Sequence, residues 1–290
     1  ATTVESQVGY RFWSRETFLL SNNVLLVIAA LTILLGTLYP LFLDALGGGK
    51  ISVGPPYFNA AFVPLMVLLV VAMGFGLGSK WKRINPNELL RLLRSPALMA
   101  VVLGLAFPFA YDGEFNASTA LAAALLVWLL AASWVDLSRR LRHQNWWRGL
   151  RQLNPGYYGM LLAHLGVGVM AMGIAVVSHY SVQKDLRMGV GDQAKLGQYE
   201  FTFMGVQDVV GPNFTAVEGQ VKVVKDSDFV TYLLPQKRTY TSRGQVMTEA
   251  SIDPALSRDI YVAMGEPLSD GAWAMRLHIK PLIRWIWLGA

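Results

Sequence analysis

An apolar stretch at residues 157–180 constrains the fold of this chain more than any other segment. It contains no Asp, Glu, Lys or Arg, and its length of about 24 residues is enough for an α-helix to cross the hydrocarbon core of a bilayer. The stretch therefore predicts a transmembrane helix. The whole composition agrees, because 53% of the 290 residues are hydrophobic and 15% are charged, which indicates a membrane protein with a substantial soluble part.

Four further apolar stretches precede this one, at about residues 23–46, 59–78, 97–110 and 119–135. Each of them predicts one more membrane-spanning helix, and we expect Pro40 to bend the first. We also predict two short helices outside the spans. One is residues 87–93 along the membrane surface, and the other is an amphipathic helix in the basic segment that follows the fourth span, anchored at the interface by Trp146 and Trp147.

The basic residues are distributed unevenly between the two sides of these spans. The loop between the second and third spans carries five of them and the loop between the fourth and fifth spans another five, whereas the two opposite turns together carry only Lys50. The ten are Lys80, Lys82, Arg83, Arg91, Arg94, Arg139, Arg140, Arg142, Arg148 and Arg151. Because basic loops stay on the cytoplasmic side, the residues after the fifth span are expected on the outer side. The net charge of +6 thus reflects topology, and no nucleic-acid partner is expected.

The pattern changes after the fifth span. From residue 181 to about 277, apolar residues alternate with polar ones, which is typical of half-buried strands. We predict a small antiparallel sandwich or barrel in the periplasm, followed by the start of a truncated sixth span. The expected fold is a membrane α-helical bundle of five complete transmembrane helices with an inserted all-β domain. The predicted regions are residues 1–180, 181–278 and 279–290, and we expect them to form a fragment of a larger membrane protein.

His164 is an ionisable side chain within the fifth apolar stretch. Such a group in the membrane needs a partner and is a functional candidate. Gly168 lies one helical turn later and Ala171 two turns later, so the surface beside the imidazole is nearly bare. That surface suits another helix packed through small residues, or a planar cofactor whose metal binds the imidazole. The sequence pattern leaves both interpretations open, and His143, His179 and His278 are interpreted as surface or interfacial residues.

Several kinds of chemistry have no motif in this sequence. It contains no cysteine, so disulfide and thiol chemistry are excluded. Neither a phosphate-binding loop nor a dinucleotide-binding glycine motif occurs, and no histidines or carboxylates have the spacing of a metal cluster or a catalytic triad. Catalytic residues are therefore not predicted. Any redox role would depend on a bound cofactor or on a partner.

Several short segments, in order along the chain, resemble the CcmF family. They are SRETFLLSNNVLL from Ser14, LGTLYP from Leu35, GPPYFN from Gly54, HLG at His164, YS-x-x-x-D-x-R-M-x-x-GD from Tyr180, MTEASID from Met247 and KP-x-x-RWIWLG from Lys280. CcmF is the haem lyase subunit of the cytochrome c maturation system. The resemblance runs the full length of the chain.

This resemblance implies a subunit of the holocytochrome c synthase, in the bacterial inner membrane, that assists the covalent attachment of haem to apocytochrome c. The implied cofactor is a resident haem b, with His164 as one axial ligand of its iron and Gly168 beneath the porphyrin. The implied partners are apocytochrome c, the haem chaperone and thiol-handling subunits of the same system, and membrane lipid, with a quinol as a further candidate; the sequence does not identify the electron donor. The family's tryptophan-rich segment and its three other histidines are missing here, so this chain resembles the C-terminal part alone.

Two alternative functions stay open at this level. One is a haem transporter or channel component with an outer β-domain, and the other is a docking scaffold of the maturation complex with no chemistry of its own. Transporters of this kind often contain helices broken near the middle of the membrane, whereas the prolines here lie toward the ends of the predicted spans. A bis-histidine haem b spectrum would favour the lyase interpretation, and a colourless protein would favour the alternatives.

Overall fold

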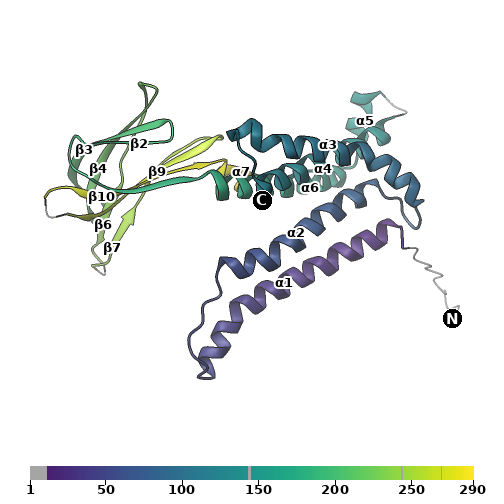
Figure 1. Cartoon of the computed structure of the whole chain (residues 1–290), viewed down its shortest axis with the longest axis horizontal. Coiled ribbons are helices and arrows are strands. Elements are labelled where there is room, and N and C mark those ends of the chain that lie inside the picture. The colour runs from purple at the N-terminus through teal and green to yellow at the C-terminus, as the bar shows by residue number, and fades with distance from the viewer. Residues whose placement is uncertain (1–11, 143–144, 243, 269) are drawn as a thin grey trace. The chain divides into compact units, whose positions relative to one another are not determined.

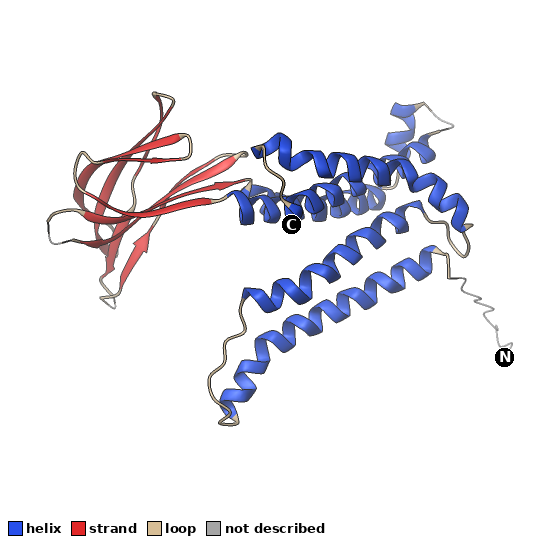
Figure 2. Cartoon of the chain, in the orientation of Figure 1, coloured by secondary structure: helices blue, strands red, loops and turns tan. Residues whose placement is uncertain are grey.

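The computed structural model describes residues 12–142, 145–242, 244–268 and 270–290. The chain divides into two compact units, Ala1–Met172 with Gly289–Ala290, and Gly173–Leu288. The first unit holds most of the helices and the second contains the strands, as Figure 2 shows by colour.

Five described helices are long and apolar enough to cross a membrane, which confirms the predicted number of spans. They are α1 (Arg15–Ala45), α2 (Pro55–Gly78), α3 (Pro86–Asp112), α4 (Ala117–Leu141) and α6 (Pro155–Tyr180) (Figure 1). The chain is therefore a multi-pass membrane protein. The short helix α5 (Trp146–Gln152) confirms the helix predicted in the basic segment.

The helices extend beyond the apolar stretches because polar residues cap them. The Ser14 side chain accepts a hydrogen bond from the Thr17 backbone at the start of α1, and Asn116 does the same for Thr119 at the start of α4. These caps satisfy backbone N–H groups that have no partner within the helix. Pro40 lies within α1 and does not end it.

The third span differs from its prediction. The separate surface helix at residues 87–93 is wrong, because α3 is continuous from Pro86 to Asp112. Pro96 lies between the two predicted elements, and the buried face of α3 continues through it. The buried residues are Leu89, Leu93, Pro96, Ala100, Gly104 and Pro108. A proline in a membrane helix is tolerated where neighbouring elements satisfy the freed carbonyl. The gap predicted between residues 93 and 97 is therefore helical, with Pro96 on the buried face.

Close contacts at small residues hold α2, α3 and α4 together. A Cβ at Gly104 in α3 would lie 2.8 Å from the Ala124 Cα in α4, and a Cβ at Gly74 in α2 would overlap the Trp128 indole. Trp128 in α4 also donates a hydrogen bond of 3.3 Å to the Val71 carbonyl in α2. Small residues at helix contacts let the backbones approach closely, as in other membrane bundles.

Ten described strands form an antiparallel β-sandwich between α6 and α7 (Ile283–Gly289) (Figure 2). Their bounds are β1 (Val182–Met188), β2 (Gln193–Leu196), β3 (Tyr199–Val210), β4 (Phe214–Lys225), β5 (Asp228–Leu233), β6 (Gln236–Tyr240), β7 (Val246–Glu249), β8 (Ser251–Pro254), β9 (Arg258–Pro267) and β10 (Trp273–Pro281). One sheet has the order β1-β10-β9-β8, and the other has the order β2-β3-β4-β6-β7, with β5 pairing β4. This confirms the predicted all-β domain.

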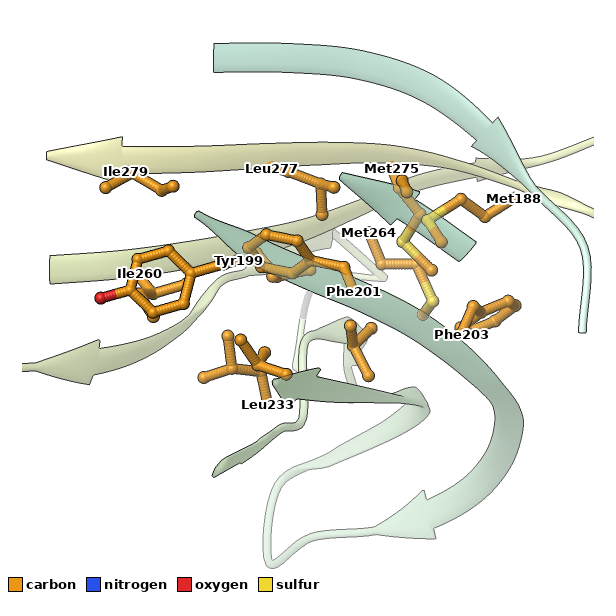
Figure 3. Packing of buried hydrophobic residues seen from close by; sticks show 14 residues of the cluster. Met188, Tyr199, Phe201, Phe203, Leu233, Ile260, Met264, Met275, Leu277 and Ile279 are labelled. Atoms are coloured by element: carbon orange, nitrogen blue, oxygen red, sulfur yellow. The ribbon is translucent and has the colours of Figure 1, made fainter. Parts of the chain in front are cut away.

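The core of the sandwich comes from the inward-facing side chains of both sheets. Phe201 and Phe203 of β3 are fully buried with Met264 of β9 and Leu277 of β10 (Figure 3). The alternation expected from the sequence thus places one face of each sheet in a shared core. The first and last strands also pair directly, with Val182 opposite Ile279.

The end of the sandwich lies later than expected. The predicted last strand stops at residue 277, with membrane re-entry from residue 279, whereas β10 continues to Pro281. Leu282 then adopts a left-handed backbone with φ of 52° and begins the turn into α7. Apolar Ile279 belongs to the sandwich core, which explains why its hydrophobicity was wrongly interpreted as the start of a span.

Candidate functional site

His164 lies in α6 and is half-buried in the helical unit. Its Nδ1 atom is 2.7 Å from the Met160 carbonyl oxygen, one helical turn earlier. A carbonyl oxygen can only accept a hydrogen bond, so Nδ1 carries a proton, and in the Nδ1–H tautomer Nε2 is the nitrogen that can accept. This tautomer is the one that a metal-binding imidazole needs, because the second ring nitrogen of such a ligand is normally held by a carbonyl or carboxylate.

Gly168 is buried against helix α4. A Cβ at this position would lie 3.0 Å from the Leu126 Cδ1 atom and 3.3 Å from the Leu126 Cα atom. Its bare surface therefore accommodates a neighbouring helix, the packing interpretation that the sequence left open. The role of Gly168 beneath a porphyrin stays a prediction.

The other glycines of α6 fall on a different side of the helix. A Cβ at Gly166 would overlap the Gly289 carbonyl, and a Cβ at Gly173 would lie 2.9 Å from the Ile286 nitrogen in α7. Gly159 has open space around it. Successive residues turn by about 100° around a helix. Gly166 and Gly173 therefore lie on one side of α6, and His164 lies on the opposite side.

Of the remaining histidines, His179 lies in α6, fifteen residues after His164, and His278 lies in the β-sandwich. His143 falls outside the described residues. His179 is exposed in the last turn of α6, with its ring 4.7 Å from that of Tyr180. His278 lies within β10, where partial burial, followed by the charges of Lys280 and Arg276, lowers the pKa of its imidazole. Among the described residues, no group of three or more His, Asp or Glu is arranged to hold a metal ion.

A buried carboxylate that bonds to the helix of His164 was not predicted from the sequence. The Asp136 side chain in α4 is 11% exposed. Its Oδ2 atom accepts hydrogen bonds from the Tyr157 hydroxyl in α6 at 2.8 Å and from the Arg140 Nε atom at 2.9 Å. The guanidinium also lies 4.5 Å from the centre of the Tyr157 ring. The spacing of Asp136 and Arg140, four residues apart at a helix end, is the one signal in the sequence that indicates this cluster.

Comparison with known proteins gives a consistent family assignment. Residues 179–281 match the family model described as the CcmF C-terminal β-sandwich. The chain is 48% identical over 289 residues to the cytochrome c-type biogenesis protein CcmF of Pseudomonas fluorescens and 41% identical over 286 residues to that of Escherichia coli (strain K12). These matches cover 100% and 99% of the chain but 44% and 43% of the relatives. The chain thus spans less than half the length of these relatives.

A solved structure, that of the cytochrome c haem lyase CcmF, has the same fold. It matches with a TM-score of 0.78, covering 96% of this chain and 44% of that one, at 22% sequence identity. The sandwich match, the full-length similarity to the two relatives and the shared fold agree with one another: the chain is similar along its whole length to CcmF proteins, and its sandwich matches the C-terminal β-sandwich of that family.

Proposed function

We propose that this chain is part of a haem lyase that assists the attachment of haem to apocytochrome c, and that His164 is an axial ligand of a resident haem b. The relatives named CcmF are cytochrome c-type biogenesis proteins, which supports the first half of the proposal. The second half depends on His164 itself.

The hydrogen bond from His164 to the Met160 carbonyl is the single observation that supports ligation most directly. It holds the ring in one tautomer, limits its rotation and leaves Nε2 as a lone-pair donor. The residues present therefore fit one axial position of a haem iron. The same hydrogen bond would also satisfy a histidine that binds no metal, and the absorption spectrum described below separates the two roles.

The second axial ligand must come from elsewhere. His164 is the one histidine that the structure describes within the first unit. Haem iron in b-type sites takes its ligands from protein side chains such as histidine. His179 is fifteen residues beyond His164 on the same helix, roughly 22 Å along its axis, which is too far to share one iron, so we infer that the other imidazole lies outside the described membrane helices.

A haem held at His164 would supply one-electron reduction, which haem attachment requires along with reduced cysteine thiols. The chain has no cysteine, so the thiols belong to the apocytochrome and to thiol-handling partner subunits, and the incoming haem to a haem chaperone. The contribution of this chain to the site is the His164 imidazole, oriented by the Met160 carbonyl. A quinol is proposed as the electron donor. Gly168 is proposed to let the porphyrin come close to the α6 backbone beside His164.

The proposed location is the bacterial inner membrane, with the β-sandwich in the periplasm. Ten basic residues on one side of the spans against Lys50 on the other support this orientation. The position of His164 in α6, nine residues after Pro155, corresponds to roughly 14 Å along the helix axis at a rise of about 1.5 Å per residue. The ligand then lies in the cytoplasmic half of the membrane, which suits an electron relay better than the group that is transferred to cytochrome.

The alternative of a transporter or channel has less support from the helices. All five described spans are continuous, whereas transporters of this kind bind substrate where helices are broken near the middle of the membrane.

The test is to replace His164 with Ala in the intact protein and to record its absorption spectrum after purification. We expect loss of the low-spin b-type signal with little change in folding, because the substitution removes a polar group from an apolar helix. His179→Ala, at the exposed end of the same helix, is the matched control and should keep the signal. A His164→Ala protein with an unchanged spectrum would remove this residue from the site, and a colourless wild type would favour a scaffold or transporter.

A further inference from the structure

We infer that Asp136 and Tyr157 are positioning residues for His164, because their hydrogen bond fixes the position of α6 along α4. This inference rests on the proposed function of His164. It concerns the helix that carries the imidazole and assigns no contact between the pair and the haem.

The first support is the arrangement of contacts along α6. Tyr157 precedes His164 by seven residues, about two turns or roughly 10 Å, and it donates its hydroxyl proton to Asp136 in α4 at 2.8 Å. Gly168 follows His164 by one turn and packs against Leu126 in the same helix α4. Helix α6 is thus held against α4 on both sides of His164, by a polar contact at one end and by steric fit at the other.

The second support is the burial of the carboxylate. The Asp136 side chain is 11% exposed, and an ionised group in a membrane bundle is retained only with partners. Both of its described partners, Tyr157 and Arg140, bond to the same Oδ2 atom. An apolar pair would pack two helices equally well, but it would permit sliding. A hydrogen bond from one hydroxyl to one oxygen defines a single register.

The third support is the route from Tyr157 to the imidazole. Met160 lies between them in α6, and its carbonyl holds His164 Nδ1 at 2.7 Å. The Met160 side chain packs against the buried cluster of the helical unit. A rotation or slide of α6 that followed loss of the Tyr157 contact would move this carbonyl, and with it the orientation of the ring.

The experiment compares Tyr157→Phe with Tyr158→Phe in the intact haem-loaded protein. The control removes the neighbouring hydroxyl, which bonds to the Leu150 carbonyl instead of to α4. The readouts are the rate of haem loss to an apoprotein scavenger and the midpoint potential of the haem. We expect Tyr157→Phe to weaken haem binding about tenfold, the lower end of the loss seen when the hydrogen-bond partner of a metal ligand is disturbed, because the Met160 carbonyl that holds His164 would move. If the weakening falls on the oxidised state alone, the midpoint potential rises by about 59 mV. Tyr158→Phe should match the wild type in both.

A second pair of variants tests the carboxylate. Asp136→Asn keeps an oxygen that can accept from Tyr157 and should retain most of the haem affinity, whereas Asp136→Leu should lose it to the same extent as Tyr157→Phe. If Tyr157→Phe lowers the unfolding temperature but leaves haem loss and potential unchanged, the pair is structural only and the inference is overturned. That result leaves His164 as a ligand, whereas a wild-type protein without a b-type spectrum overturns the proposed function itself.

Discussion

Gly173 of α6 lies against Ile286 of α7, so closely that a Cβ at position 173 would come within 2.9 Å of the Ile286 nitrogen. Gly173 follows His164 by nine residues, which corresponds to about half a turn beyond two full turns. The side of α6 that receives α7 is therefore opposite the side that carries His164. The contact with α7 and the proposed ligation thus use different sides of one helix.

Replacing Gly173 with Ala should destabilise the protein without changing its haem spectrum. The added methyl would meet backbone atoms of α7, and overpacking of this kind typically costs about 1–3 kcal/mol. Gly159→Ala is the matched control, because nothing lies within 4 Å of a Cβ at that position and alanine favours a helix over glycine by about 1 kcal/mol. Denaturant unfolding in detergent measures both variants. Equal stability of the two would show that α7 does not need the close approach.

Gly168→Leu should reduce haem binding although His164 is still present. A Cβ alone would lie 3.3 Å from the Leu126 Cα atom, so a leucine must push α6 away from α4 and alter the setting of the imidazole. Haem content per protein after purification is the measurement. A full haem complement with an unchanged spectrum would mean that the contact with α4 has no bearing on the site.

The topology can be tested with a reporter that is active only in the cytoplasm. The reporter is fused after Gly211, in the turn between β3 and β4, and the fusion is expected to be inactive because the sandwich lies on the outer side. A fusion after Lys82, in the basic loop between α2 and α3, should be active. Strong activity of the Gly211 fusion would contradict the proposed orientation.

We expect the sandwich to serve as a docking surface for the apocytochrome or for a partner subunit. Phe229 and Tyr232 of β5 are 56% and 47% exposed, and their rings are 5.0 Å apart. Exposed aromatic residues of this kind often act as anchors at protein interfaces. Replacing both with Ser should lower cytochrome c assembly several-fold and leave the haem spectrum intact. Val210→Ser, at an 82% exposed position in β3, is the control, and equal assembly by both proteins would argue against docking at β5.

The stability of the sandwich should depend on pH through His278. Partial burial, followed by Lys280 and Arg276, lowers the pKa of His278 below its ordinary value, which is about 6.5. The unfolded chain then binds a proton that the folded protein does not, so stability falls as the pH drops below about 6.5 and levels off below the folded pKa. His278→Gln should remove this part of the pH dependence in thermal unfolding. An unchanged profile would show that His278 contributes none of it.

The sequence predicted the parts of the fold that depend on local hydrophobic patterns. Apolar length was enough to identify all five spans, and alternation was enough to identify the sandwich. The two errors, a gap before residue 97 and a span from residue 279, have one cause, since tertiary packing overrode the local pattern at both places. Pro96 belongs to the buried face of a continuous α3, and Ile279 belongs to the sandwich core.

The candidate site was only partly predictable for a related reason. His164 stands out in the sequence because it interrupts an apolar helix. Asp136 does not, because it lies near the basic end of α4, where a charged residue is unremarkable. Its partner Tyr157 is 21 residues away in the sequence and in another helix. Which residues of two helices meet depends on their register, and a hydrophobic pattern does not specify register to within one turn.

The pairing of the first strand with the last has an evolutionary consequence. Val182 of β1 lies opposite Ile279 of β10, so the chain enters and leaves the sandwich at neighbouring points of one sheet. A domain whose ends are adjacent can be inserted into a host protein with little disturbance. The sandwich can therefore diverge, or be exchanged between relatives, as a self-contained cassette. Selection on its partners can then proceed independently of selection on the helices that surround His164.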